Sequence, residues 1–264
     1  MPRCRSAAVG RASSGTRNMP ERSSRGERTP AEFAAILSAA ELPLIVGGQA
    51  INIWAELYAA RVPELEAFAP FTSLDADICS SRALAETLAR RAGWEFRPVN
   101  EHESGVVAIL TKATAPGQPP LTIEVLQEVN GLTDADLGLD ATIELASGER
   151  YRTPSPLVLL KAKLYNLASL ANLDRPQDVK HARMLLHIVP QYFNELLAEH
   201  RAGKITAANL IGAIRYARDV ACASFARNAA RAHGFDFRRL LPASLGFAPK
   251  EIQKAVQEFM TQMN

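Results

Sequence analysis

Ser73-Leu74-Asp75-Ala76-Asp77-Ile78 is the stretch of sequence that decides the fold, because it places two carboxylates one residue apart among apolar residues. Successive side chains of an extended strand point to opposite faces, so the pattern predicts that Asp75 and Asp77 share one face and the apolar residues the other. Two carboxylates held this close repel each other unless a cation lies between them, and hard oxygen ligands at this spacing suit Mg²⁺. The alternative interpretation is a half-buried strand with a solvated polar face.

Length and composition are typical of a soluble globular protein. The chain has 264 residues, of which 47% are hydrophobic and 22% charged, enough for one large domain or two moderate ones. No run of about 18 uninterrupted apolar residues occurs, so no membrane-spanning helix is expected. Three widely separated cysteines, Cys4, Cys79 and Cys222, argue against a zinc site or a disulfide framework and favour a cytoplasmic location.

The net charge of +2 is unevenly distributed. Residues 1–30 carry seven Arg and two Glu, a net of +5, so the remainder carries −3. This Arg- and Ser-rich start has few large apolar residues and predicts disorder over residues 1–30. A transit peptide and a misassigned start codon remain open explanations for it. The acidic remainder argues against a nucleic-acid binder that works through overall charge, although a local basic patch stays open.

Residues 31–153 show patterns of both helices and strands. A helix is predicted to begin at Thr29-Pro30, and a short apolar strand over 42–46 runs into Gly47-Gly48 and a second helix. A strand that turns through Gly-Gly into a helix presents free N–H groups at a positive helix end, which suits phosphate. Ser80 or Ser81 is expected to cap a further helix. Later strands are predicted over 94–99, 105–112, 121–129 and 141–145.

The chain from Pro154 is predicted to be all-α. Helices are expected over 156–173, 174–188, 190 to about 200, 205–233 and 249–263, after a Pro-rich hinge over 152–156. The predicted fold class is therefore α+β, with a mixed β-sheet and flanking helices over 31–153 followed by a helical bundle over 154–264.

A few polar residues of these segments are candidates for a site. Glu124 is a third carboxylate on a predicted strand, and Lys161 is a stronger candidate than Lys163 to face a cleft between the two halves. Arg175 and Asp178 are expected to form a simple i,i+3 helix pair. His181 and His187 are expected to be partly exposed helix residues rather than ligands.

The order of these features resembles the nucleotidyltransferase superfamily that includes DNA polymerase beta and the aminoglycoside nucleotidyltransferases. Within it, the chain looks most like the bacterial nucleotidyltransferase toxins of abortive-infection systems. The matching pieces are Gly47-Gly48, Ser73-Leu74-Asp75-Ala76-Asp77, Glu124, Lys161 with Lys163, and Arg175-Pro176-Gln177-Asp178. The resemblance covers roughly residues 31–200. The chain departs from the pattern in the longer segment from Gly48 to Asp75 and in a Glu where the third acid is more usually Asp.

This resemblance implies a Mg²⁺-dependent enzyme that moves a nucleoside monophosphate from an NTP, such as ATP, to an acceptor hydroxyl on a small molecule, a protein or RNA. The residues implied to bind metal and act in catalysis are Asp75, Asp77 and Glu124. Those implied to bind the nucleotide are Gly47, Gly48, Ser73 and Lys161. The main alternative is a catalytically degenerate relative that binds a partner, such as a cognate antitoxin. A transferase of the terminal phosphate is a further alternative.

Overall fold

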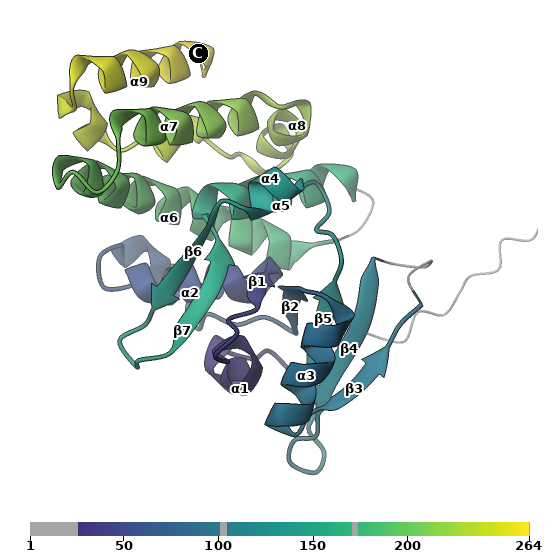
Figure 1. The fold of residues 1–264 in the computed structure, drawn as a ribbon. Helices are drawn as coiled ribbons and strands as arrows, with labels where there is room; N and C mark the ends of the chain where they lie inside the picture. The colour runs from purple at the N-terminus through teal and green to yellow at the C-terminus, as the bar shows by residue number, and fades with distance from the viewer. Residues whose placement is uncertain (1–25, 101–104, 171–173, 264) are drawn as a thin grey trace, which may run out of the picture.

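The structure is a computed structural model, and it describes residues 26–100, 105–170 and 174–263 (Figure 1). Within these ranges seven strands form one mixed sheet in the order β3-β4-β5-β2-β1-β7-β6. All seven strands lie before Ser155, and the elements described from Pro156 onward are all helices. The predicted α+β class is therefore confirmed. None of the helices in the described ranges is both long enough and apolar enough to span a bilayer.

The centre of the sheet is built from short apolar strands. β1 (Leu44–Val46) is buried along its whole length, and it pairs antiparallel with β2 (Ala76–Cys79). β2 pairs in parallel with β5 (Leu121–Leu126). In β2 the alternation predicted from the sequence is present, since Ala76 and Ile78 are fully buried while the residues between and after them are not. Continuous burial of β1 suits a strand covered on both faces.

The outer strands complete the sheet on both sides. β4 (Val106–Lys112) pairs antiparallel with β5 through a bulge near its start, and β3 (Glu95–Pro98) forms one edge. On the other side β7 (Arg150–Pro154) pairs in parallel with β1, and β6 (Asp140–Glu144) forms the second edge.

Strand β7 corrects the prediction of a hinge over 152–156. Tyr151 and Thr153 are buried while Arg150 and Arg152 are exposed, which is the period of two that marks a strand. The two prolines that suggested a hinge stand at the end of this strand and at the start of the next helix instead, where a missing N–H is tolerated.

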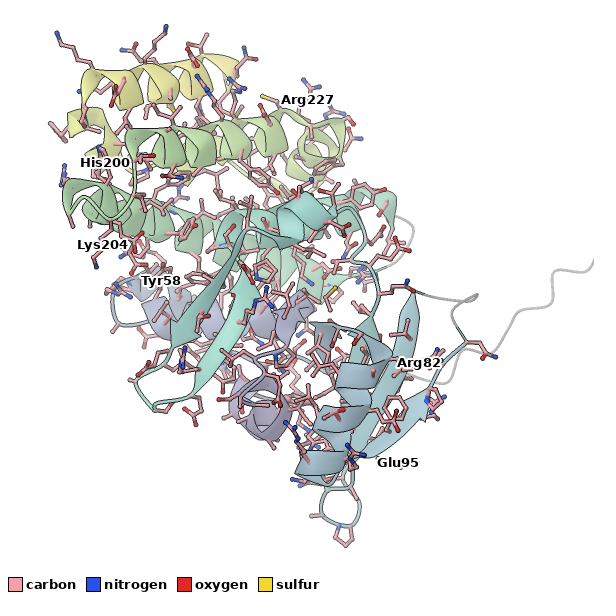
Figure 2. All side chains as sticks on the ribbon, viewed as in Figure 1. Tyr58, Arg82, Glu95, His200, Lys204 and Arg227 are labelled. Atoms are coloured by element: carbon pink, nitrogen blue, oxygen red, sulfur yellow. The ribbon has the colours of Figure 1, made fainter. Side chains whose placement is uncertain are left out.

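Four helices accompany the sheet. They are α1 (Ala34–Leu37), α2 (Gly47–Tyr58), α3 (Arg82–Ala92) and α4 (Asp134–Leu137), with 3₁₀ turns over Pro30–Phe33 and Pro63–Phe68. The predicted cap of α3 is Ser81, whose side chain accepts a hydrogen bond from the N–H of Leu84. Arg82 ties this helix to β3 and β4 by donating to the backbone carbonyls of Val99 and Val107 (Figure 2).

The helical half contains α5 (Pro156–Ser169), α6 (Pro176–Arg201), α7 (Ala207–Cys222), α8 (Ser224–His233) and α9 (Lys250–Gln262). Figure 1 shows α6, α7 and α9 one above another beyond the sheet. Two predictions were wrong here. α6 continues through Pro190, which removes a single N–H while buried Ile188, Val189 and Phe193 hold the helix. The helix predicted over 205–233 is divided at Ala223, which has an extended ψ of 146°.

Helix α2 joins the two halves. It packs against β1 and β2 on one side and against α5 and α6 on the other. At its end lies Tyr58 (Figure 2), whose hydroxyl donates a 2.5 Å hydrogen bond to Glu195 of α6. One turn earlier, the Trp54 indole donates to the carbonyl of Pro154. One hydrophobic cluster includes residues of the sheet and residues of the helical half. Packing on both sides therefore fixes the position of α2 and of its first turn.

Candidate functional site

Asp77 and Glu124 lie side by side in the middle of the sheet. Asp77 of β2 is the registered partner of Glu124 in the parallel strand β5 and of Val46 in the antiparallel strand β1. Registered partners on neighbouring strands point to the same face, so the two carboxylates are neighbours. Asp75 lies directly before β2 and raises the pKa of Asp77 through its charge. The structure therefore makes Asp77 and Glu124 neighbours and places Asp75 close enough for its charge to act on Asp77.

The Gly47-Gly48 turn lies directly against these acids. Gly47 follows Val46, has a φ of +67°, and approaches so closely that a Cβ built on it would be 2.0 Å from Oδ2 of Asp77. A Cβ on Gly48 would be 2.4 Å from Oγ of Ser73. Both glycines open helix α2, where the backbone N–H groups are not used by the helix itself. The absence of two side chains thus lets a positive helix end approach the carboxylates and Ser73.

The carboxyl of Asp77 has an unusual proton affinity. Burial, together with the charges of Asp75 and Glu124, raises its pKa to about 8, although Lys163 acts in the opposite direction. Burial is the largest cause, so the shift reflects first the removal of water from the carboxyl and then the negative charges beside it. A bound cation would reverse it, because a metal ligand has to be deprotonated.

The cation that lowers the pKa of Asp77 is Lys163 of α5. Its ammonium group is buried and donates a 2.7 Å bond to Asp178 of α6, which also accepts a hydrogen bond from Arg175. Burial raises the pKa of Asp178, and the two cations outweigh this and lower it overall. The expected Arg175–Asp178 pair is present, and it belongs to a larger cluster that reaches the candidate site.

Lys161, the lysine preferred from the sequence, lies elsewhere. Its ammonium group donates a 2.8 Å bond to Asp136 of α4, whose other oxygen accepts a 2.5 Å bond from the Tyr216 hydroxyl of α7. Residues two apart on an α-helix point in nearly opposite directions, so only one of the two lysines of α5 faces the acids. In this structure that lysine is Lys163.

His181 corrects the expectation of a partly exposed residue. Its side chain is 1% exposed, and its Cε1 would lie 2.8 Å from a Cβ on Gly48. Neither ring nitrogen has a hydrogen-bond partner among the residues that the structure describes. Burial and the charge of Lys163 hold the pKa of His181 well below its ordinary value, so the ring is neutral at pH 7. His181 lies three residues after Asp178, which places it on the same face of α6.

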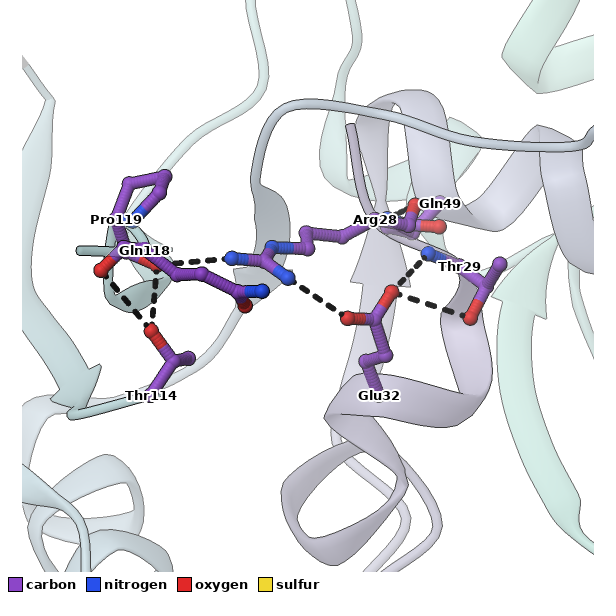
Figure 3. Close-up of polar contacts among 7 residues, drawn as sticks. All are labelled: Arg28, Thr29, Glu32, Gln49, Thr114, Gln118 and Pro119. Carbon is purple, nitrogen blue, oxygen red and sulfur yellow. Dashed lines mark hydrogen bonds and ion pairs between the residues drawn. The ribbon is translucent and has the colours of Figure 1, made fainter. Parts of the chain in front are cut away.

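The segment that leads into Asp75 is held by residues expected to be disordered. Arg28 exchanges two backbone hydrogen bonds with Ser73, of 2.8 and 2.9 Å. The carbonyl of Arg28 also accepts a bond from the buried Gln49 of α2 (Figure 3). The Arg28 guanidinium donates to Glu32 and to the carbonyl of Pro119. The disorder predicted for residues 1–30 is thus wrong for 27–30, and residues 1–25 lie outside the described residues.

The carboxylates are of the type that a hard divalent cation prefers. Burial raises the pKa of Asp77 most, and the charges of Asp75 and Glu124, which add to the effect, are charges that a cation would neutralise. In the described part of the chain, no group of three or more His, Cys, Asp or Glu side chains is placed so that it could hold a metal ion. Mg²⁺ is commonly held by one or two carboxylates together with water and substrate phosphates, so a turn suited to phosphate beside two acids fits this ion.

Comparison with known proteins identified no relative of the chain. No protein-family model matches the chain, and no curated protein is significantly similar to it. The arguments that follow therefore depend on the residues and their geometry.

Proposed function

We propose that this protein is a nucleotidyltransferase that moves a nucleoside monophosphate from an NTP to an acceptor hydroxyl. The observation that supports it best is the contact between the Gly47 turn and Asp77, because it joins a phosphate-suited helix end to a carboxylate cluster. The resemblance of the motifs, in the same order along the chain, supports the same reaction.

Each part of the site has a task in such a reaction. Backbone N–H groups at the start of α2 and the Ser73 hydroxyl would bind the phosphates of the NTP. Asp75 and Asp77 would hold Mg²⁺, which when bound neutralises phosphate charge and stabilises the leaving pyrophosphate. Lys163 would keep the cluster from becoming too negative for a triphosphate to enter. Positioning and charge stabilisation are the main requirements of phosphoryl chemistry.

The bond changes balance as follows. The acceptor hydroxyl oxygen forms a bond to the α-phosphorus, the bond from that phosphorus to the bridging oxygen breaks, and pyrophosphate leaves with that oxygen. The proton of the acceptor hydroxyl passes to a carboxylate, for which Glu124 is the candidate because it lies next to Asp77.

A transfer assay tests the proposal. The full chain is incubated with Mg²⁺, each of the four α-labelled NTPs in turn, and separate small-molecule, protein and RNA fractions of a cell extract. Wild type should transfer label to one fraction and release pyrophosphate. Asp75→Asn and Asp77→Asn should each lower the rate by on the order of a hundredfold or more. The matched control is Asp219→Asn, whose side chain is 68% exposed on α7 and which should keep the wild-type rate.

Three results would contradict the proposal. They are no transfer from any NTP, transfer that Asp77→Asn leaves intact, and release of a nucleoside diphosphate in place of pyrophosphate. The last would identify a transferase of the terminal phosphate. Binding of Mg–NTP without any transfer would identify a binding module.

A further inference from the structure

Three hollows follow one face of α6. The first, of about 480 Å³, is lined by Phe68 and Arg183, which also line the second, of about 240 Å³. The second shares His187 and Arg239 with the third, of about 250 Å³, which ends at Asn194. The α6 residues that line them recur every three or four positions: Pro176, Val179, Lys180, Arg183, Leu186, His187, Pro190, Gln191 and Asn194.

We call this connected surface the α6 groove. It comprises the α6 residues just named together with Phe68, His233, Phe235 and Arg239. Because an α-helix rises 1.5 Å per residue, the face from Pro176 to Asn194 is about 27 Å long. A groove of this length is suited to an extended ligand rather than to a single small molecule.

The α6 groove is basic although the chain beyond residue 30 is acidic overall. Lys180, Arg183 and Arg239 line it, and within the described ranges none of the three forms an ion pair with a carboxylate. Two acids line the three hollows: Asp236, which is bonded to Arg238 at 2.8 Å, and Glu64 in the third hollow. Arg61 also lines the third hollow, so the cations outnumber the acids four to two. Cations that lie along a hollow without a carboxylate partner attract a ligand with several negative charges.

Aromatic rings lie among these cations. Phe68 and His187 have ring centroids 6.0 Å apart, and His233 and Phe235 have centroids 5.6 Å apart. Both pairs line the middle hollow together with Arg183 and Arg239. A basic groove with aromatic rings is how proteins bind single-stranded nucleic acid, since the cations follow the phosphates and the bases stack on the rings. An acidic peptide would use the cations, and it would stack on the rings only where it carries aromatic residues of its own.

One end of the α6 groove touches the segment that carries the candidate acids. Lys180 donates a 3.4 Å hydrogen bond to the carbonyl of Pro70, and Gln177 donates a 3.0 Å bond to the carbonyl of Thr72. Thr72 lies three residues before Asp75. A strand bound along the groove would therefore have one end near the site.

We propose that the α6 groove binds a single-stranded nucleic acid, and that a hydroxyl of this strand is the acceptor of the reaction. The binding surface depends on the chemistry of the groove itself, whereas the acceptor role rests on the proposed function. The backbone phosphates contact Lys180, Arg183 and Arg239, and bases stack on Phe68 and His233.

Fluorescence anisotropy tests the surface without catalysis. Dye-labelled 12-residue oligouridylate and oligothymidylate are titrated with the full chain at several salt concentrations, without NTP or Mg²⁺. Binding should weaken with salt, and Arg183→Gln and Arg239→Gln should each reduce the slope of log K against log salt by about 0.7. Arg90→Gln, on the exposed side of α3, is the matched control and should leave the slope unchanged. Phe68→Leu should weaken binding about tenfold without changing the slope.

Several results would overturn the proposal. One is that neither oligonucleotide binds more tightly than a labelled polyglutamate of equal length. Another is that a duplex of equal length binds more tightly than the single strand, and a third is that Arg183→Gln and Arg239→Gln behave as Arg90→Gln does.

The acceptor role is separated from the surface by two further measurements. Asp77→Asn should bind the oligonucleotide as wild type does. Label transfer to small molecules or proteins alone, with intact oligonucleotide binding, would overturn the acceptor role and leave the surface standing.

Discussion

Gly47 and Asp77 are in contact in a way that only glycine allows. A Cβ on Gly47 would be 2.0 Å from Oδ2 of Asp77, and the φ of +67° at Gly47 is one that other residues rarely adopt. The turn after β1 and the central acid of the site therefore require glycine at position 47. The loss of stability on replacing this glycine can be measured.

Replacing Gly47 by Ala should cost about 3 kcal/mol of unfolding free energy, the sum of backbone strain and the clash with Asp77. Gly93→Ala is a matched control, because Gly93 has a φ of +70° and open space where its Cβ would be. It should cost only the strain, about 1–2 kcal/mol. Urea unfolding measures both values, and equal losses would show that the contact with Asp77 contributes nothing.

Lys163→Met should be strongly destabilising, because it leaves the buried Asp178 with Arg175 as its remaining cation. Removing one member of a buried ion pair typically costs 3–5 kcal/mol, and the remaining cation favours the lower end, about 3 kcal/mol. Lys204→Met, at an exposed position beyond the end of α6 (Figure 2), should change stability by no more than about 0.5 kcal/mol. Similar urea midpoints for the two variants would argue against a structural role for the buried pair.

The sequence was sufficient to place Asp77 and Glu124 on strands, because period-two alternation is a local property. Asp75, predicted on the same strand as Asp77, instead lies directly before β2. The sequence was not sufficient to show that β5 pairs with β2, since strand order depends on packing between segments far apart in the chain. The sequence could not distinguish Lys161 from Lys163 for the same reason. Both lie in one apolar run, and only the position of α5 relative to the sheet decides which lysine faces the acids.

Strand β7 differs from the prediction although the sequence contains a local signal for it. Charged and uncharged residues alternate from Arg150 to Thr153, a period of two that marks β7, although the two prolines that follow suggested a hinge. Burial of His181 had no such signal, because its neighbours on α6 are mixed in polarity. It follows from how α6 packs against Gly48, which is a tertiary contact.

Arg28→Ala tests whether the segment over 27–29 supports the site. The Arg28 side chain is 13% exposed and donates a 2.9 Å bond to the carbonyl of Pro119, so its loss should cost about 1 kcal/mol (Figure 3). Its pair with Glu32 is more exposed and adds little. Arg90→Ala on α3 should be nearly neutral. Equal stability of the two variants in urea would mean that the Arg28 side chain does not hold this segment.

Asp136 predicts how stability depends on acid pH. Burial raises the pKa of its carboxyl, but hydrogen bonds from Lys161, Tyr216 and Thr133 outweigh this and bring it to about 2. Because the folded pKa is lower than the unfolded value, the ionised carboxylate stabilises the fold by about 2 kcal/mol above pH 4. That contribution is lost as the pH falls from about 4 to about 2. Asp136→Asn lacks the titrating group, so the stability difference between wild type and this variant should be constant from pH 7 to 5 and shrink below pH 4. Urea unfolding across this range measures the difference, and a difference that stays constant down to pH 2.5 would show that Asp136 titrates normally in the folded protein.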